Sequence, residues 1–272
     1  MRFGSSKGIA LVTALVVLVA GCSTSSPDAG SAAAPAPYST IKELVAAVAQ
    51  RQRADQTARL SLRGEVTGGA TLQFTGEGVL RVLDDAVSVK FTQVVTQKGA
   101  APQETGFVVL PDATYLRLPP SPGENAPDRP WVRVDPTSSD PAAQRLAALA
   151  TTLTESADPT RTLARYADAT QISDAADDII DGEPAVRYTI VVDLAKAAAQ
   201  QTDPAMKTRL EQQVRGGLTT VTSTLWVDAL GQPVRSAVRQ DLPGIGTLVI
   251  TGSYRDWGQP VEIDAPPATQ VR

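Results

Sequence analysis

The single cysteine of the chain, Cys22, follows Val19-Ala20-Gly21 at the end of an apolar stretch. Small residues directly before a cysteine at this place form a lipobox, in which the thiol receives a diacylglyceryl thioether and the cysteine becomes the mature N-terminus. The other interpretation is an ordinary secretory signal that contains a cysteine by chance. The position of the only cysteine favours lipidation of Cys22.

The residues before Cys22 have the layout of a targeting signal. Arg2 and Lys7 form a positive region, and the mostly apolar residues 9–20 are too few to cross a bilayer, which takes about 20. We expect a signal peptide at 1–21, a lipidated N-terminus and flexible tether at 22–37, and a folded domain at 38–272. Two or three acyl chains such as palmitate on Cys22 would hold the protein on the extracytoplasmic face of the cell membrane.

The sequence contains only weak matches to the motifs of known catalytic sites. Ser39 and Lys42 have the S-x-x-K spacing of penicillin-interacting serine enzymes, but the S-D-N and K-T-G companions are absent, and a helix cap explains the same residues. The chain has no histidine, which excludes Ser-His-Asp triads and H-E-x-x-H zinc sites. We therefore expect a protein that is not an enzyme and needs no cofactor.

An acidic cluster between Asp174 and Glu183 offers oxygen ligands for Ca²⁺, but its spacing does not match an EF-hand loop. We interpret it as a solvated loop before a hairpin turn at Asp181-Gly182. The formal net charge is -4 and the pI is near 5.0, which argues against a nucleic-acid partner.

The apolar periodicity predicts the elements that would position a site. Thr40 and Glu43 form a capping box that opens a helix at 40–53. Alternation of apolar and polar residues predicts strands. Strands are expected near 58–63, 71–75, 80–82, 87–92, 107–110, 115–118, 131–134, 186–192, 219–228, 233–241 and 246–255, and further helices near 141–155, 160–168, 194–201 and 204–214. With the proline-rich residues 119–130 as a loop, this is an α+β fold with a single antiparallel sheet.

The apolar face of that sheet is the candidate site. Helices could close over it to give a filled core, or close incompletely and leave an apolar cavity. Periodicity alone leaves both possibilities open. The candidate lining residues are Leu60, Leu62, Leu72, Phe74, Leu80, Val82, Val87, Val89, Phe91, Tyr188, Ile190, Leu225, Val227, Leu248 and Ile250.

The end of the chain carries a motif that points to a family. It reads Thr222-Ser223-Thr224-Leu225-Trp226-Val227-Asp228, then Gly231-Gln232-Pro233-Val234-Arg235, then Tyr254-Arg255-Asp256-Trp257-Gly258-Gln259-Pro260-Val261 and Ala265-Pro266-Pro267. With the lipobox, the tether and the element order, it resembles the actinobacterial LppX/LprG lipoproteins, whose fold is LolA-like.

The resemblance implies a sheet curled into a half-barrel with helices packed on its concave side. It also implies that acylated lipids or glycolipids bind in an apolar cavity and are carried across the cell envelope by a monomer, with an envelope transporter as a possible partner. It brings no catalytic residues, and Cys22 alone transfers position for position. The alternative is a lipid-anchored surface interaction protein with a filled core and no ligand.

Overall fold

The computed structural model describes residues 36–68, 71–83, 86–119, 128–135, 137–138, 140, 143–144, 146–147, 163–242, 244 and 246–272. The helices are α1 (Ile41–Asp55), α4 (Leu194–Gln200) and α5 (Pro204–Arg215), with short 3-10 turns at Ala167–Ala169 and Ala268–Gln270. The strands are β1 (Thr57–Gly68), β2 (Leu72–Leu83), β3 (Ala86–Gln97), β4 (Gln103–Val109), β5 (Thr114–Arg117), β6 (Trp131–Arg133), β7 (Thr170–Ile180), β8 (Glu183–Asp193), β9 (Thr220–Asp228), β10 (Pro233–Leu242) and β11 (Gly246–Arg255).

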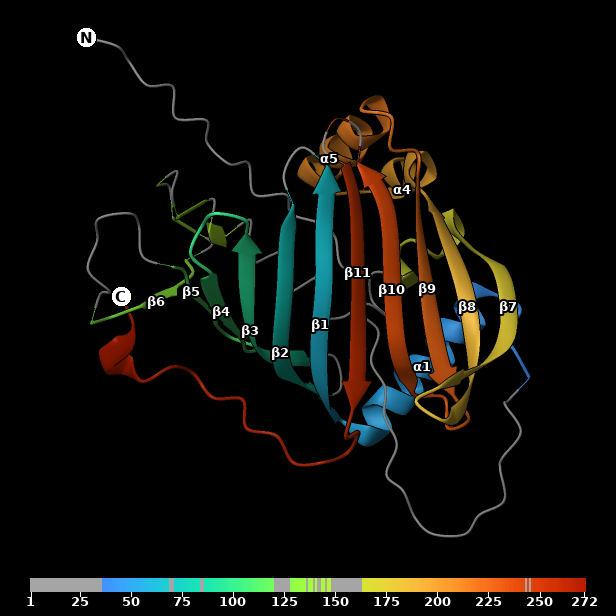
Figure 1. Cartoon of the computed structure of the whole chain (residues 1–272), viewed down its shortest axis with the longest axis horizontal. Helices are drawn as coiled ribbons and strands as arrows, with labels where there is room; N and C mark the ends of the chain where they lie inside the picture. Colours follow the sequence, from blue (N-terminus) through green and yellow to red (C-terminus); the bar gives the residue numbers. More distant parts are fainter. Residues whose placement is uncertain are drawn as a thin grey trace.

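The strands form one sheet in the order β6-β5-β4-β3-β2-β1-β11-β10-β9-β8-β7. Every neighbouring pair is antiparallel, and the pairing of β1 with β11 joins an N-terminal meander to a C-terminal one (Figure 1). The sheet does not close into a barrel, because β6 and β7 form its two edges. The predicted single antiparallel sheet of an α+β fold is therefore confirmed, and its described part has 11 strands.

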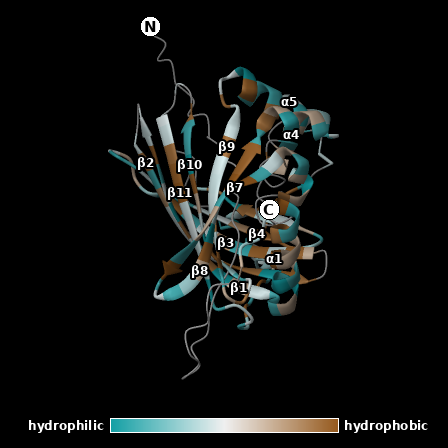
Figure 2. Cartoon of the chain, turned by 90° about the vertical axis from the view of Figure 1, so that its right-hand side faces the viewer, coloured by the Kyte–Doolittle hydropathy of each residue, from teal (hydrophilic) through white to brown (hydrophobic). Residues whose placement is uncertain are grey.

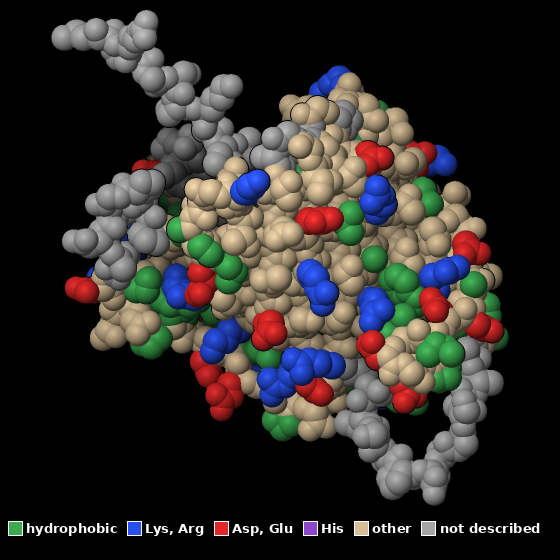
Figure 3. All heavy atoms as spheres, in the orientation of Figure 1, with side chains coloured by type: hydrophobic (Ala, Val, Ile, Leu, Met, Phe, Trp, Pro, Cys, Tyr) green, Lys and Arg blue, Asp and Glu red, His purple; other side chains and the backbone are tan. Residues whose placement is uncertain are grey.

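The two faces of the sheet differ as the alternation predicts. Figure 2 shows α1, α4 and α5 on one side of the sheet, which we call the inner face. On the outer face, side chains such as Arg63 and Glu77 are exposed, and Figure 3 shows basic and acidic groups interspersed over it. Mixed charges on this face keep it in water, so the apolar side chains gather on the inner face.

Helix α1 begins as the sequence predicts. Thr40 Oγ1 accepts a hydrogen bond from the Glu43 backbone N–H at 3.2 Å, and Glu43 Oε2 accepts one from the Thr40 N–H at 3.2 Å. This capping box satisfies two helix-end donors. The Ser39 hydroxyl donates to the same Glu43 carboxylate, while Lys42 pairs with Asp168 at 2.7 Å. Ser39 thus supports the helix end, in line with the capping interpretation, and Lys42 forms an ion pair with the 3-10 turn at Ala167–Ala169.

The loop predicted at 174–180 is wrong, whereas the hairpin turn predicted at Asp181-Gly182 is confirmed. Residues 174–180 belong to the edge strand β7, and Asp181 and Gly182 form the turn to β8. The carboxylates find partners on β8, β9 and β10. Trp226 Nε1 donates to Asp178 Oδ2 at 2.8 Å, Arg187 pairs with Asp174 at 3.4 Å, and Arg235 pairs with Asp181 at 3.1 Å. Charged side chains on an edge strand also oppose pairing with another chain.

The C-terminal segment protects the opposite edge. After β11 the chain passes beneath β2 and β3 toward β6 (Figure 1). Val261 and Ile263 are buried there with Val108 on the outer face, and the Arg272 backbone N–H donates to the Trp131 carbonyl at 2.8 Å. The β6 edge therefore has a backbone partner from the chain's own end.

Several predictions fall on residues outside the described part. These are the signal peptide and lipobox with Cys22, and most of the 119–130 loop and of the helix near 141–155. Of the helix predicted near 160–168, residues 163–165 are helical and Ala167–Ala169 form a 3-10 turn, whereas residues 160–162 lie outside the described part. The predicted helices at 194–201 and 204–214 are confirmed as α4 and α5. Among the described residues, no helix is long and apolar enough to span a membrane.

Candidate functional site

Strand register places the candidate lining residues on one face. Leu62 of β1 is opposite Gly252 of β11 and Gly76 of β2, and Leu60 is opposite Tyr254 and Gly78. In an antiparallel pair, residues directly opposite each other project to the same side of the sheet. The same register argument extends this face to β8, where Tyr188 is opposite Leu225 of β9.

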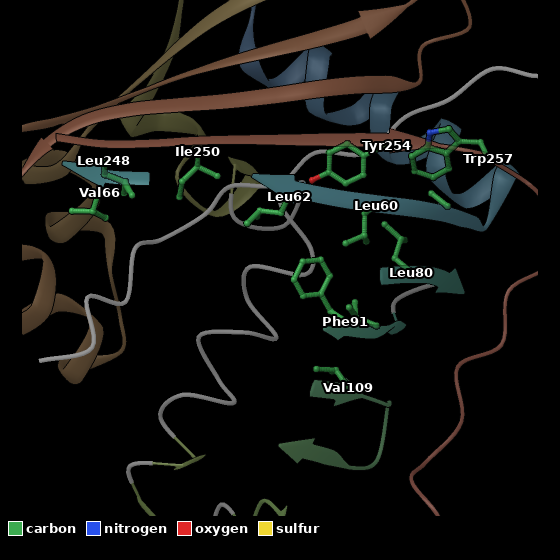
Figure 4. Packing of buried hydrophobic residues seen from close by; sticks show 12 residues of the cluster. Leu60, Leu62, Val66, Leu80, Phe91, Val109, Leu248, Ile250, Tyr254 and Trp257 are labelled. Carbon is green, nitrogen blue, oxygen red and sulfur yellow. The ribbon is translucent and has the colours of Figure 1, made fainter. Parts of the chain in front are cut away.

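This inner face divides into two apolar clusters. The first, here called the sheet cluster, consists of Ala58, Leu60, Leu62, Val66, Leu80, Val89, Phe91, Val109, Leu248, Ile250, Tyr254 and Trp257, with Leu72, Phe74, Val82, Val87, Phe107 and Leu242 packed against it. Figure 4 shows its buried members. The second, the helix cluster, consists of Ile41, Leu44, Val45, Val48, Leu163, Val186, Tyr188, Ile190, Leu225 and Val227.

The two clusters differ in what covers them. In the helix cluster, four side chains of α1 pack against β8 and β9. The sheet cluster contains strand residues and Trp257, and no residue of α1, α4 or α5 belongs to it. Within the described part of the chain, helices therefore close one half of the inner face and not the other.

The fifteen candidate residues divide in the same way. Eleven lie in the sheet cluster or pack against it, and four, Tyr188, Ile190, Leu225 and Val227, lie in the helix cluster. The structure thus brings all fifteen to one face. Because the second group contacts α1, we expect the first group alone to offer surface to a ligand.

Glycines opposite the aromatic residues shape the sheet cluster. A Cβ atom at Gly78 would lie 2.6 Å from Cδ2 of Phe91 and 2.4 Å from the Lys90 carbonyl oxygen. A Cβ atom at Gly64 would lie 2.4 Å from the ring of Phe74. The missing side chains let both rings lie against the strand backbone. The aromatic rings therefore project less far from the sheet than they would if the glycine positions carried side chains.

A depression of about 680 Å³ lies at the ends of β10 and β11, near the loop that follows α5. Its lining residues are Gly217, Leu218, Thr219, Thr220, Gln240, Asp241, Leu242, Gly244, Gly246 and Thr247. None of the fifteen candidates borders it. Leu242 belongs to its wall and also packs against the sheet cluster, so the depression adjoins the apolar face. No sequence pattern indicated this depression, because turns and strand ends form it.

Polar groups at the other end of the strands fasten α1 to the sheet. Gln232 Nε2 donates to Asp55 Oδ2 at 2.6 Å, and Arg51 Nε donates to the same oxygen at 2.8 Å. Asp228 Oδ1 accepts the backbone N–H groups of Leu230 and Gln232. Burial raises the pKa of Asp228 to about 6, against the opposing effect of these two hydrogen bonds.

The site contains no recognisable metal centre. Within the residues that the structure describes, no three histidine, cysteine, aspartate or glutamate side chains gather in a way that could hold a metal ion. The carboxylates near Asp174 are engaged instead by Arg187 and Trp226, as described above. What lines the inner face is a long layer of apolar side chains, and the members of both clusters are buried.

No protein-family model matches the chain, and no curated protein matches it either. Similar solved structures include LprF from Mycobacterium bovis, at 15% identity over 84% of this chain and 99% of that chain, with a TM-score of 0.43. The MucA/MucB complex of Pseudomonas aeruginosa matches at 15% identity, 79% and 55% coverage, and TM-score 0.35. The LolA superfamily protein NE2245 from Nitrosomonas europaea matches at 10% identity, 85% and 96% coverage, and TM-score 0.25.

These findings agree with the resemblance to LppX/LprG and LolA proteins drawn from the closing motif. At such identities and TM-scores the likeness does not extend to ligands or to individual residues. The function must therefore be argued from the side chains of this chain.

Proposed function

We propose that this protein is a lipid-anchored, extracytoplasmic carrier that binds acylated lipids along its sheet cluster and moves them across the cell envelope. The observation that carries the proposal is the division of the inner face. Helix α1 fills one half, whereas the other half presents apolar strand residues with no residue of the described helices among them. An apolar surface of this kind is what a hydrocarbon chain requires.

The dimensions and energies suit an acyl chain. From Gly246 to Tyr254, β11 extends about 26 Å at the usual rise of a strand. One leaflet of a bilayer core is roughly 15 Å deep. An acyl chain of about fifteen CH₂ groups gains roughly 12 kcal/mol on leaving water, and the membrane already provides that gain. A carrier must therefore offer a comparable apolar lining, which the sheet cluster supplies along its length.

The N-terminal sequence supports the location. Lipidation at Cys22 would place the domain outside the cytoplasm on a tether at 22–37, within reach of the membrane that supplies the lipid. Removing the signal peptide takes Arg2 and Lys7 away and lowers the formal net charge from -4 to -6. The acyl anchor, and not attraction to anionic lipids, would then hold the protein at the surface. An envelope transporter that delivers or receives the lipid is part of the same proposal.

The three tryptophans offer a direct test, because Trp257 lies in the sheet cluster while Trp131 and Trp226 lie on the outer face. The full chain with Cys22→Ser, which cannot be lipidated, would be prepared with Trp257 as its one tryptophan and, for comparison, with Trp226 as its one tryptophan. A phospholipid with brominated acyl chains should quench the fluorescence of Trp257 and not that of Trp226. Equal quenching of both, or none, would refute binding along the inner face.

Two neighbouring residues give matched variants for binding itself. Val66 is buried on the inner face, and Thr67 is exposed on the outer face of the same strand. We expect native mass spectrometry to find lipid on the Cys22→Ser chain and on its Thr67→Trp variant, and little on Val66→Trp, whose indole occupies the apolar surface. Circular dichroism checks that each variant is folded.

The alternative of a filled, ligand-free scaffold also has an observation in its favour. The members of the sheet cluster are buried, and none of the fifteen candidate residues borders the depression at the strand ends. In a scaffold, the Cys22→Ser chain would show only its own mass under gentle conditions, and Trp257 would not respond to brominated lipid. The same two measurements therefore decide between the two functions.

A further inference from the structure

Three hydroxyl groups interrupt the apolar inner face where the two clusters meet. Tyr254 of β11, Ser236 of β10 and Ser223 of β9 are all buried, at 5%, 4% and 7% exposure. Register places them on the inner face, since Leu60 is opposite Tyr254, Gly252 is opposite Ser236, and Val238 is opposite Ser223. They form a short polar row across three adjacent strands.

The Tyr254 hydroxyl has no well-formed hydrogen bond. Within the described structure no group meets its Oη atom with acceptable hydrogen-bond geometry, although the Ser236 side chain interacts with it. Burial raises the pKa of Tyr254 well above its usual value, and the interaction with Ser236 opposes this effect. The phenol therefore keeps its proton and remains a donor. Leaving a buried donor unpaired is costly, and phenylalanine would fill the same apolar space without that cost.

The direction of the hydroxyl matters. Figure 4 shows the Tyr254 oxygen on the side of Leu62, within the sheet cluster, whereas the nitrogen of Trp257 points away from Leu60 and Leu80. Trp257 Nε1 is also buried without a partner, but it is turned away from the cluster. Tyr254 thus presents a donor to the surface along which the proposed acyl chain would lie.

The charges on the sheet restrict which acceptor can meet this donor. On the described strands, register and alternation place every lysine and arginine on the outer face: Arg59, Arg63, Arg81, Lys90, Arg117, Arg133, Arg187, Arg235, Arg239 and Arg255. A carboxylate or phosphate next to Tyr254 would be a buried charge without a cation from the strands, which is strongly unfavourable. An ester carbonyl is an uncharged acceptor attached to an acyl chain.

We propose that Tyr254 Oη, assisted by Ser236, donates a hydrogen bond to the ester carbonyl of a bound acyl lipid, so that the protein selects ester-linked lipids over ether-linked lipids and free fatty acids. This inference rests on the proposed lipid-binding function. The acyl chain extends from the carbonyl along Ile250 and Leu248 toward Leu242, which adjoins the depression at the strand ends. The depression is the route by which the lipid reaches the cluster.

The test compares two probes that differ only at the linkage: dipalmitoylglycerol, a diester, and dihexadecylglycerol, the corresponding diether. Affinities are measured by quenching competition at Trp257 on the full chain with Cys22→Ser. We expect the protein to bind the diester about tenfold more tightly than the diether, as one neutral hydrogen bond provides. Tyr254→Phe should lose that preference by weakening diester binding alone, with no loss of thermal stability. Tyr115→Phe, the same change on the outer face, is the matched control.

Each outcome decides a separate question. If neither probe binds the protein, the lipid-carrier function fails, and this inference falls with it. If both probes bind with equal affinity, the carrier function stands and the role of Tyr254 is refuted. If Tyr254→Phe weakens both probes equally or lowers the melting temperature, the hydroxyl has a structural role and the inference is also refuted.

Discussion

Asp228 offers a sharp test of the electrostatics in the turn between β9 and β10, whose Gln232 also bonds Asp55 of α1. Its carboxylate is buried, and the pKa rises from 3.8 to about 6 in the folded chain. Since the folded protein then binds a proton more tightly than the unfolded chain, this group stabilises the fold below pH 4. That contribution is lost as the pH rises through about 6. The pKa difference corresponds to at most about 3 kcal/mol of unfolding free energy.

Asp228→Asn isolates this effect. Both backbone hydrogen bonds go to Oδ1, so the amide oxygen of asparagine can accept them while the charge is removed. We expect the unfolding free energy of the variant to exceed that of the parent by up to about 3 kcal/mol at pH 7 and to equal it near pH 4. Its pH dependence between 4 and 6 should be correspondingly flatter.

Urea unfolding of the Cys22→Ser chain, followed by circular dichroism at pH 4, 5, 6, 7 and 8, measures these free energies. Asp177→Asn, at an exposed position on β7, is the matched control. An Asp228→Asn variant that keeps the full pH dependence of the parent, or that is less stable than the parent at pH 7, would refute the argument. The buried carboxylate would then be stabilised by contacts stronger than its two backbone hydrogen bonds.

Two further changes test local packing. Thr40→Ala removes the side-chain acceptor at the start of α1 and should lower the unfolding free energy by about 1 kcal/mol in urea, whereas Thr40→Ser should retain it; equal losses would show that the hydroxyl is not the cap. Gly78→Ala forces a Cβ atom against Phe91 and the Lys90 carbonyl and should cost about 2 kcal/mol in a thermal melt. A stability equal to that of the parent would mean that Phe91 does not lie over this glycine.

Much of the fold was predictable because its signals are local. The capping box is contained within four residues, and the confirmed strands β8, β9, β10 and β11 alternate clearly along the sequence. Residues 174–180 were misassigned for the opposite reason. In the sequence, Asp174 and Asp178 have the pattern of solvated loop residues, and only the folded sheet brings Arg187 of β8 and Trp226 of β9 beside them. An acidic edge strand is recognisable only from its partners.

The candidate site was predictable in part. The fifteen apolar residues share one face, as alternation requires, but the sequence could not divide them between two clusters. That division depends on where α1 packs. Tyr254 and Trp257 were visible only as part of the closing motif. Their burial without hydrogen-bond partners depends on neighbours from other strands.

The amino-acid sequence by itself determined which side chains lie on the inner face, because apolar and polar residues alternate with a period of two along each strand. The tertiary structure alone decided what each side chain meets there: α1 over Tyr188 and Leu225, no described helix over Leu62 and Ile250, and an unpaired hydroxyl at Tyr254. The physical reason is that alternation sets the direction of a side chain, whereas its contacts depend on segments that are far away in the sequence.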